Sequence, residues 1–119
     1  MPQAGSAPLE VTVSPRVRLA RFALETALSV PGVVGGDPGP ARLRVTADGP
    51  GEPLQGVSVT AEPGGSYAVD LCLVAGMVPL KALADQVRRK VRSRVRRAGL
   101  TDQLGPVNVE FVDLEAGGG

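Results

Sequence analysis

A chain of 119 residues with 43% hydrophobic side chains suits one modest domain, but an aromatic content of 3% requires a core of Val, Leu and Ala. The absence of histidine removes the commonest general base and metal ligand, and a single cysteine excludes an intrachain disulfide. The formal net charge of +1 does not describe the local charge, because eleven of the thirteen basic residues fall in two expected helices.

The chain reads as one domain, over residues 9–114, between flexible ends at residues 1–8 and 115–119. Its N-terminus lacks the charged and apolar segments of a signal peptide, and no apolar run approaches the roughly 18 residues that cross a bilayer. Together with the single cysteine, these features predict a cytoplasmic protein.

The first half predicts a strand, a helix and a long loop. Residues 9–13 alternate with a period of two, as a strand does. Ser14 is the expected helix N-cap and Pro15 the first helical residue, with Val30-Pro31-Gly32 ending the helix. The loop covers residues 35–56, which hold six Gly and four Pro, and the alternation at 43–47 within it indicates a short edge strand. The helix carries an apolar stripe of Val17, Ala20, Leu24, Ala27 and Leu28.

The second half predicts a hairpin, a long helix and a last strand. Residues 57–61 and 67–73 alternate on either side of a Pro-Gly-Gly turn. The helix follows Met77-Val78-Pro79 and ends at Ala98-Gly99, and residues 107–112 form the last strand. The order βαββαβ predicts an α+β two-layer sandwich, with both helices on one face of a small antiparallel or mixed sheet.

The long helix separates apolar from basic residues. One arc of the helix is apolar, and it comprises Leu80, Leu83, Ala84, Val87, Val91, Val95 and Ala98. Asp85 is the one acid, and it is expected to relieve the repulsion among the bases through Arg88 and Arg89. Arg94 falls within the apolar arc, which leaves two interpretations: a packed stem with its head in water, or an ion pair with a neighbouring carboxylate.

The basic face of this helix is the candidate site for a partner. Three interpretations stay open: a solvated face, docking on an acidic protein or anionic membrane surface, or nonspecific nucleic-acid binding by the helix over residues 81–97. The scarcity of aromatic residues argues against base-specific RNA reading. The candidate partner-binding residues are Lys81, Arg88, Arg89, Arg92, Arg96 and Arg97.

Strand alternation also predicts an acidic face, on the side of the sheet away from the helices. Its acids are Glu10, Glu62, Asp70 and Glu110, and the face is expected to carry no base. A molecule that is basic on one side and acidic on the other is expected to self-associate head to tail, more weakly as salt rises.

The residues of catalysis and of cofactor binding are not recognisable in this chain. Cys72 lies within a strand pattern on the face opposite Leu71 and Leu73, which favours a structural thiol over a nucleophile. The acids form no pair spaced for acid–base work or metal binding, and the glycines match neither a Walker A loop nor a convincing dinucleotide fingerprint. We therefore expect a non-enzymatic protein with no catalytic residues, cofactor, metal or small-molecule substrate.

From Leu9 to Leu114, apart from the Gly/Pro-rich loop, the chain resembles the bacterial alkaline-shock protein family. The resemblance implies a non-enzymatic cytoplasmic protein of the cell-envelope stress response, which self-associates or docks on a membrane-anchored partner. The chain departs from the family in its Gly/Pro-rich loop and in a basic helix where mixed Lys and Glu are expected. The resemblance rests on Val13-Ser14-Pro15 with Val17 and Ala20, Val30-Pro31-Gly32-Val33, Val57 and Val59, Tyr67-Ala68-Val69-Asp70-Leu71, Val78-Pro79-Leu80 with Ala84, Val87, Val91 and Val95, and Val107, Val109 and Val112.

Overall fold

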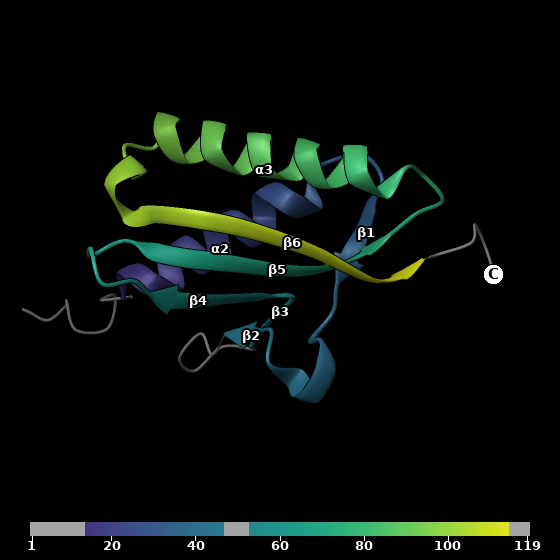
Figure 1. Ribbon diagram of the computed structural model, residues 1–119, viewed down its shortest axis with the longest axis horizontal. Coiled ribbons are helices and arrows are strands. Elements are labelled where there is room, and N and C mark those ends of the chain that lie inside the picture. The colour runs from purple at the N-terminus through teal and green to yellow at the C-terminus, as the bar shows by residue number, and fades with distance from the viewer. Residues whose placement is uncertain (1–13, 47–52, 115–119) are drawn as a thin grey trace, which may run out of the picture.

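The structure is a computed structural model that describes residues 14–46 and 53–114 (Figure 1). The strand expected at residues 9–13 and the ends 1–8 and 115–119 lie outside the described residues. Across the part described, no helix combines the length and the apolar character that crossing a membrane requires. The elements in chain order are α2 Pro15–Leu28, β1 Val33–Gly36, the 3₁₀ turn η1 Pro40–Arg42, β2 Val45–Thr46, β3 Leu54–Gln55, β4 Val57–Ala61, β5 Tyr67–Ala75, α3 Leu80–Arg97, the 3₁₀ turn η2 Thr101–Gln103 and β6 Leu104–Leu114.

β5 is the central strand of the main sheet. Its first part pairs antiparallel with β4, from Ala61 opposite Tyr67 to Val57 opposite Leu71. Its last part pairs antiparallel with β1, and its other edge pairs in parallel with β6. The predicted hairpin of β4 and β5 is therefore confirmed, within a mixed sheet.

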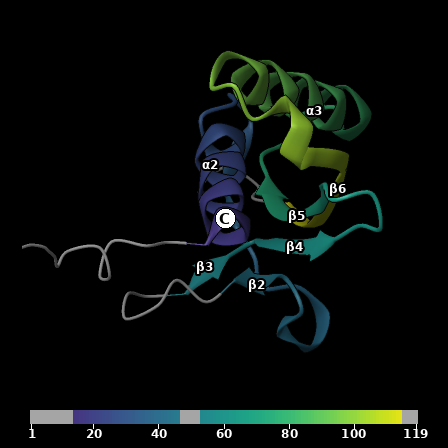
Figure 2. The same cartoon turned by 90° about the vertical axis from the view of Figure 1, so that its left-hand side faces the viewer.

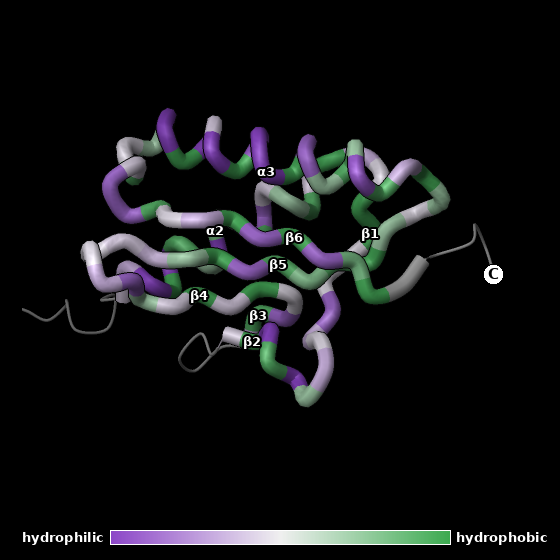
Figure 3. The backbone as a smooth tube through the Cα atoms, viewed as in Figure 1, coloured by the Kyte–Doolittle hydropathy of each residue, from purple (hydrophilic) through white to green (hydrophobic). Residues whose placement is uncertain are grey.

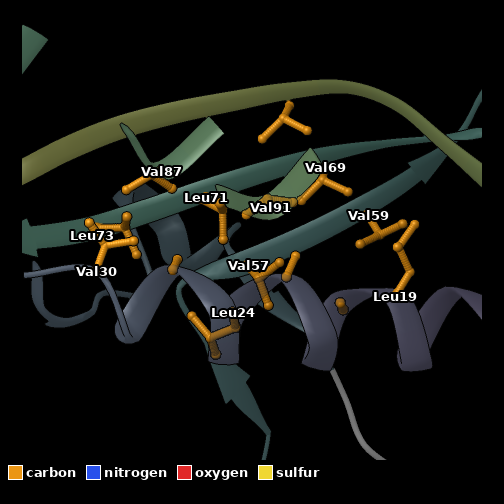
Figure 4. Close-up of a cluster of buried hydrophobic side chains, with 14 of the residues drawn as sticks. Leu19, Leu24, Val30, Val57, Val59, Val69, Leu71, Leu73, Val87 and Val91 are labelled. Atoms are coloured by element: carbon orange, nitrogen blue, oxygen red, sulfur yellow. The ribbon is translucent and has the colours of Figure 1, made fainter. Parts of the chain in front are cut away.

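Both helices pack on the same face of this sheet, and the apolar core lies between the two layers (Figures 1 and 2). The predicted α+β two-layer architecture is thus confirmed. The close-up in Figure 4 shows side chains of α2 packed against those of β4 and β5, and Val87 and Val91 of α3 belong to the same cluster. The largest fully buried apolar side chains are Leu19, Val57, Val69, Leu71, Leu73, Val87, Val91 and Val95.

Helix α2 begins where the sequence predicts. The Val17 backbone N–H donates to Ser14 Oγ at 3.2 Å, and Pro15 occupies the first turn. Four of the five residues of the predicted apolar stripe are buried, but Leu28 is 42% exposed. Leu28 is the last helical residue and does not share the burial of the other four.

Helix α3 is held by Leu83, Val87, Val91 and Val95, each at most 3% exposed. Burial of such side chains contributes about 1.5–3 kcal/mol each before conformational entropy is subtracted, against a few tenths of a kcal/mol for each like-charged pair. The helix ends at Arg97 and Gly99 follows with φ of +75°, a conformation that suits glycine at a helix end. The apolar contacts therefore decide how α3 lies, despite its charge.

The structure corrects the assignment of residues 35–56 to a loop. Residues 33–36 form strand β1, which follows β4 along the same edge of β5. Of the edge strand expected at 43–47, the described residues form Val45–Thr46, paired with Leu54–Gln55, and residue 47 lies outside the described range. Glycine is required where β1 and β4 meet, because a Cβ on Gly36 would overlap the Gln55 carbonyl oxygen.

Residues 37–46, here called the flap, leave the end of β1 and cross the face of the sheet opposite the helices. The Asp37 N–H donates to the Cys72 carbonyl at 3.0 Å, and the Gly56 N–H donates to the Arg44 carbonyl at 2.7 Å. The Thr46 hydroxyl donates to the Val57 carbonyl at 2.8 Å. These bonds fix the flap to both β4 and β5.

Replacement of Gly56 by Ala is predicted to destabilise the fold by about 1–3 kcal/mol, because Gly56 has a positive φ that L-residues rarely adopt. A Cβ there would also lie 2.7 Å from Gly36 Cα. Chemical denaturation measures the difference, with Gly64→Ala as the control, because Gly64 is exposed and has open space around it. Equal stability of the two variants would contradict the close packing of β1 and β4.

Candidate functional site

The outward side of α3 carries a dense set of positive charges. In Figure 3 the hydrophilic residues of α3 lie away from the sheet and the hydrophobic ones toward it. Within the described residues, none of the exposed bases of α3 forms an ion pair. These seven bases, called the basic surface below, are Lys81, Arg89, Lys90, Arg92, Arg94, Arg96 and Arg97.

The basic surface extends over the outermost position of α3 and both of its flanks. At about 100° per residue, Arg89 lies directly opposite the buried arc, and the uncharged Ala82 lies beside it. Arg92 and Arg96 fall on the flank toward β6, and Lys90, Arg94 and Arg97 fall on the flank toward α2; the contacts of Arg88 and Arg94 described next identify the two sides.

Arg88 differs from the other candidates because it is half-buried and held. Its Nη1 donates to Asp85 Oδ1 at 2.8 Å, and its Nε donates to the Val107 carbonyl of β6 at 3.3 Å. The predicted pairing of Asp85 with Arg88 is confirmed, whereas no ion pair with Arg89 is found in the part of the chain described. Arg88 therefore joins α3 to the sheet and is less available to a partner than its exposed neighbours.

Arg94 reaches across to α2. Its guanidinium carbon lies 6.0 Å from the centroid of the Phe22 ring, at the distance of a cation–π contact worth about 0.5–1 kcal/mol at an exposed site. The alternative of an ion pair with a neighbouring carboxylate is not found for Arg94 among the described residues.

A small depression opens on the β6 flank, where η2 turns back against the end of α3. Its volume is about 100 Å³. Arg92 and Arg96, one helical turn apart, were predicted from sequence, whereas Thr101 and Leu104 were not. The helix stop at Ala98-Gly99, with a turn directly after it, is the sequence signal that places residues 101–104 near the last helical turn. The lining residues are Arg92, Val95, Arg96, Thr101 and Leu104.

The predicted acidic face is not free of bases. Arg44 of the flap places Nη2 3.8 Å from Glu110 Oε1, and Asp70 accepts a hydrogen bond from Asn108 Nδ2 at 2.9 Å. Glu62 lies at the turn between β4 and β5, and Glu10 lies outside the described residues. The prediction of a face without bases is wrong because strand alternation does not register a loop that crosses the sheet.

Cys72 is fully buried although it points away from the helices, because the flap covers it. A Cβ on Gly39 would lie 3.5 Å from its Sγ. Burial raises the pKa of the Cys72 thiol, the negative charges of Glu110 and Asp37 raise it further, and the Arg44 charge lowers it. This placement agrees with a structural thiol.

No family model and no curated protein matches the chain, but solved structures do. A point variant of MamM CTD aligns at 14% identity with a TM-score of 0.55, over 84% of this chain and 99% of that chain. A structure described as a copper form of MamM CTD aligns at 14% identity and TM-score 0.54, over 83% of this chain and 86% of that chain. The likeness is one of fold. It supports the α+β architecture and does not bear on the alkaline-shock resemblance, which stays a prediction.

The described residues of this chain offer few side chains that could bind the copper named in that description. It has no histidine, and the described residues hold no group of three Cys, Asp or Glu side chains arranged around a common point. The copper is therefore a property of MamM CTD and carries no argument about this chain.

The raised pKa of Cys72 predicts that the fold loses stability at high pH. The thiol ionises more readily in the unfolded chain, so the free energy of unfolding falls as pH rises through the ordinary thiol pKa, from about pH 8 to about pH 10. Denaturation curves of the wild type and of Cys72→Ala over this range isolate the contribution. An equal pH dependence in both proteins, or rapid labelling of the native thiol, would contradict the buried position.

Proposed function

We propose that this chain is a non-enzymatic, cytoplasmic adaptor that docks through the basic surface of α3 on an acidic protein partner. The observation that carries the proposal is the set of seven exposed cations on one helix, none of them paired with a carboxylate in the described part. The resemblance to alkaline-shock proteins favours a membrane-anchored partner in the cell-envelope stress response.

The energetics of α3 favour docking over a merely solvated face. Charges of one sign on a helix repel each other, and Asp85 is the single acid of α3. An anionic partner replaces this repulsion with attraction and speeds encounter between the two molecules. Because Leu83 and the three valines already fix the helix on the core, docking requires no further ordering of its backbone.

Nonspecific nucleic-acid binding is the alternative function. The same arginines can contact phosphates. Single-strand binding usually adds aromatic faces on which bases stack. The three aromatic residues of the chain, Phe22, Tyr67 and Phe111, are all partly buried against the core. Phe22 lies beside the basic surface, but the Arg94 guanidinium already stands over its ring.

Self-association is a second proposed property, through contact of the basic surface of one copy with the acids on the outer sheet face of another. Glu110 retains 47% side-chain exposure despite its contact with Arg44. We expect an association that weakens as salt shortens the Debye length below about 8 Å. Sedimentation velocity at several salt concentrations measures it, and a monomer at every salt concentration would contradict head-to-tail contact.

Reversal of charge on α3 tests the docking itself. The triple variant Arg89→Glu, Arg92→Glu and Arg96→Glu is expected to lose capture of an envelope-associated partner from lysate, because it replaces attraction by repulsion. Affinity purification with mass spectrometry measures the captured proteins.

A matched control reverses three exposed arginines elsewhere, Arg16, Arg18 and Arg42. This control is expected to keep the partner, because its charge change is equal but lies outside α3. Loss of capture in both triple variants would indicate a dependence on net charge alone. Tight binding of duplex or single-stranded nucleic acid by the purified wild type, with a steep salt slope, would favour the alternative function.

A further inference from the structure

We infer that the depression beside Arg92 and Arg96 is a subsite that takes one aliphatic side chain flanked by carboxylates, within an acidic segment of the partner. This inference rests on the docking function proposed above, and it specifies which sequence the basic surface prefers. A partner recognised by charge alone needs only acidic residues, whereas this subsite requires an apolar residue among the acidic ones.

The depression combines an apolar floor with a cationic rim. Val95 is 1% exposed and Leu104 is half-buried, so the floor belongs to the core layer. Arg92 and Arg96 are exposed and stand on successive turns of α3, and Thr101 adds an exposed hydroxyl from η2. An aliphatic side chain therefore meets carbon at the floor, while neighbouring carboxylates meet two guanidinium groups.

Within residues 14–46 and 53–114, neither rim arginine forms an ion pair. The carbonyls of Arg94, Val95 and Arg96 near the end of α3 already accept the N–H groups of Ala98, Leu100 and Gly99. Asp102 of η2 directly follows Thr101, which lines the depression, yet Asp102 forms no ion pair with Arg92 or Arg96. Both guanidinium groups thus remain free for carboxylates brought by a partner.

The size of the depression separates a side-chain subsite from other uses. A volume of about 100 Å³ is well below the roughly 300–1,000 Å³ of a pocket for a substrate or cofactor. An engineered cavity of roughly 150 Å³ holds benzene, so this depression accommodates a single aliphatic side chain. No aromatic residue lines it, which leaves a nucleobase without a stacking surface.

Two labelled peptides test the subsite directly: one of eight glutamates, and the same peptide with leucine in place of one central glutamate. Despite its lower charge, the leucine peptide is expected to bind the wild type about threefold or more tighter, since part of the leucine is removed from water. Fluorescence anisotropy at about 0.1 M salt measures both affinities, and amide NMR shifts at Thr101 and Leu104 are expected with the leucine peptide only.

Two double variants with the same loss of charge locate the effect. Arg92→Ala with Arg96→Ala is expected to weaken binding of the leucine peptide about tenfold or more. Arg89→Ala with Arg97→Ala removes two exposed arginines of the same helix that do not line the depression, and it is expected to weaken binding about threefold or less. Thermal melting of both variants verifies that they fold.

The outcomes distinguish the subsite from the docking. Equal affinity for the two peptides, with equal losses in the two double variants, would overturn the subsite and leave charge-driven docking in place. Failure of the wild type to bind either peptide, even at low salt, would overturn both. Tighter binding of duplex DNA than of either peptide, with equal losses in the two double variants, would overturn the acidic-segment partner in favour of nucleic acid.

Discussion

Burial of β5 on both faces is the constraint on which the rest of the structure depends. Toward the helices, Val69, Leu71 and Leu73 form the centre of the core. On the opposite side Cys72 is enclosed by the flap, and both edges of the strand are paired with other strands. Because β5 is enclosed on both faces and along both edges, it fixes the relative positions of the helices, β6 and the flap. The position of the basic surface follows from that of α3.

The division of α3 into apolar and cationic sides has a simple physical origin. The valines at 87, 91 and 95 recur every four residues and occupy one arc, so the bases between them must lie on the flanks and beyond. Apolar burial outweighs the mutual repulsion of the bases by several-fold. The protein thereby presents like charges in a fixed arrangement, which a flexible basic segment would present only after losing entropy on binding.

Local signals in the sequence were sufficient for most of the fold. Ser14-Pro15 marks the start of α2, the Pro-Gly-Gly turn marks the hairpin, and the period of the valines marks α3. Strand β1 was missed because Gly35 and Gly36 have no intrinsic preference for a strand and depend on pairing with β5. For the site, the exposed arginines followed from the helical period. Arg44 above the sheet and Thr101 beside the helix end could not be predicted, because their positions depend on how loops return to the core.

The meeting of Gly36 with Gly56 also has an evolutionary consequence. The backbone departs from the sheet at one glycine and rejoins it at the other, so the intervening stretch begins and ends at nearly the same place. The entropy lost in closing such an excursion grows only with the logarithm of its length. Related chains are therefore free to change the length of this stretch, provided that the flap still covers Cys72 and keeps its hydrogen bonds to β4 and β5.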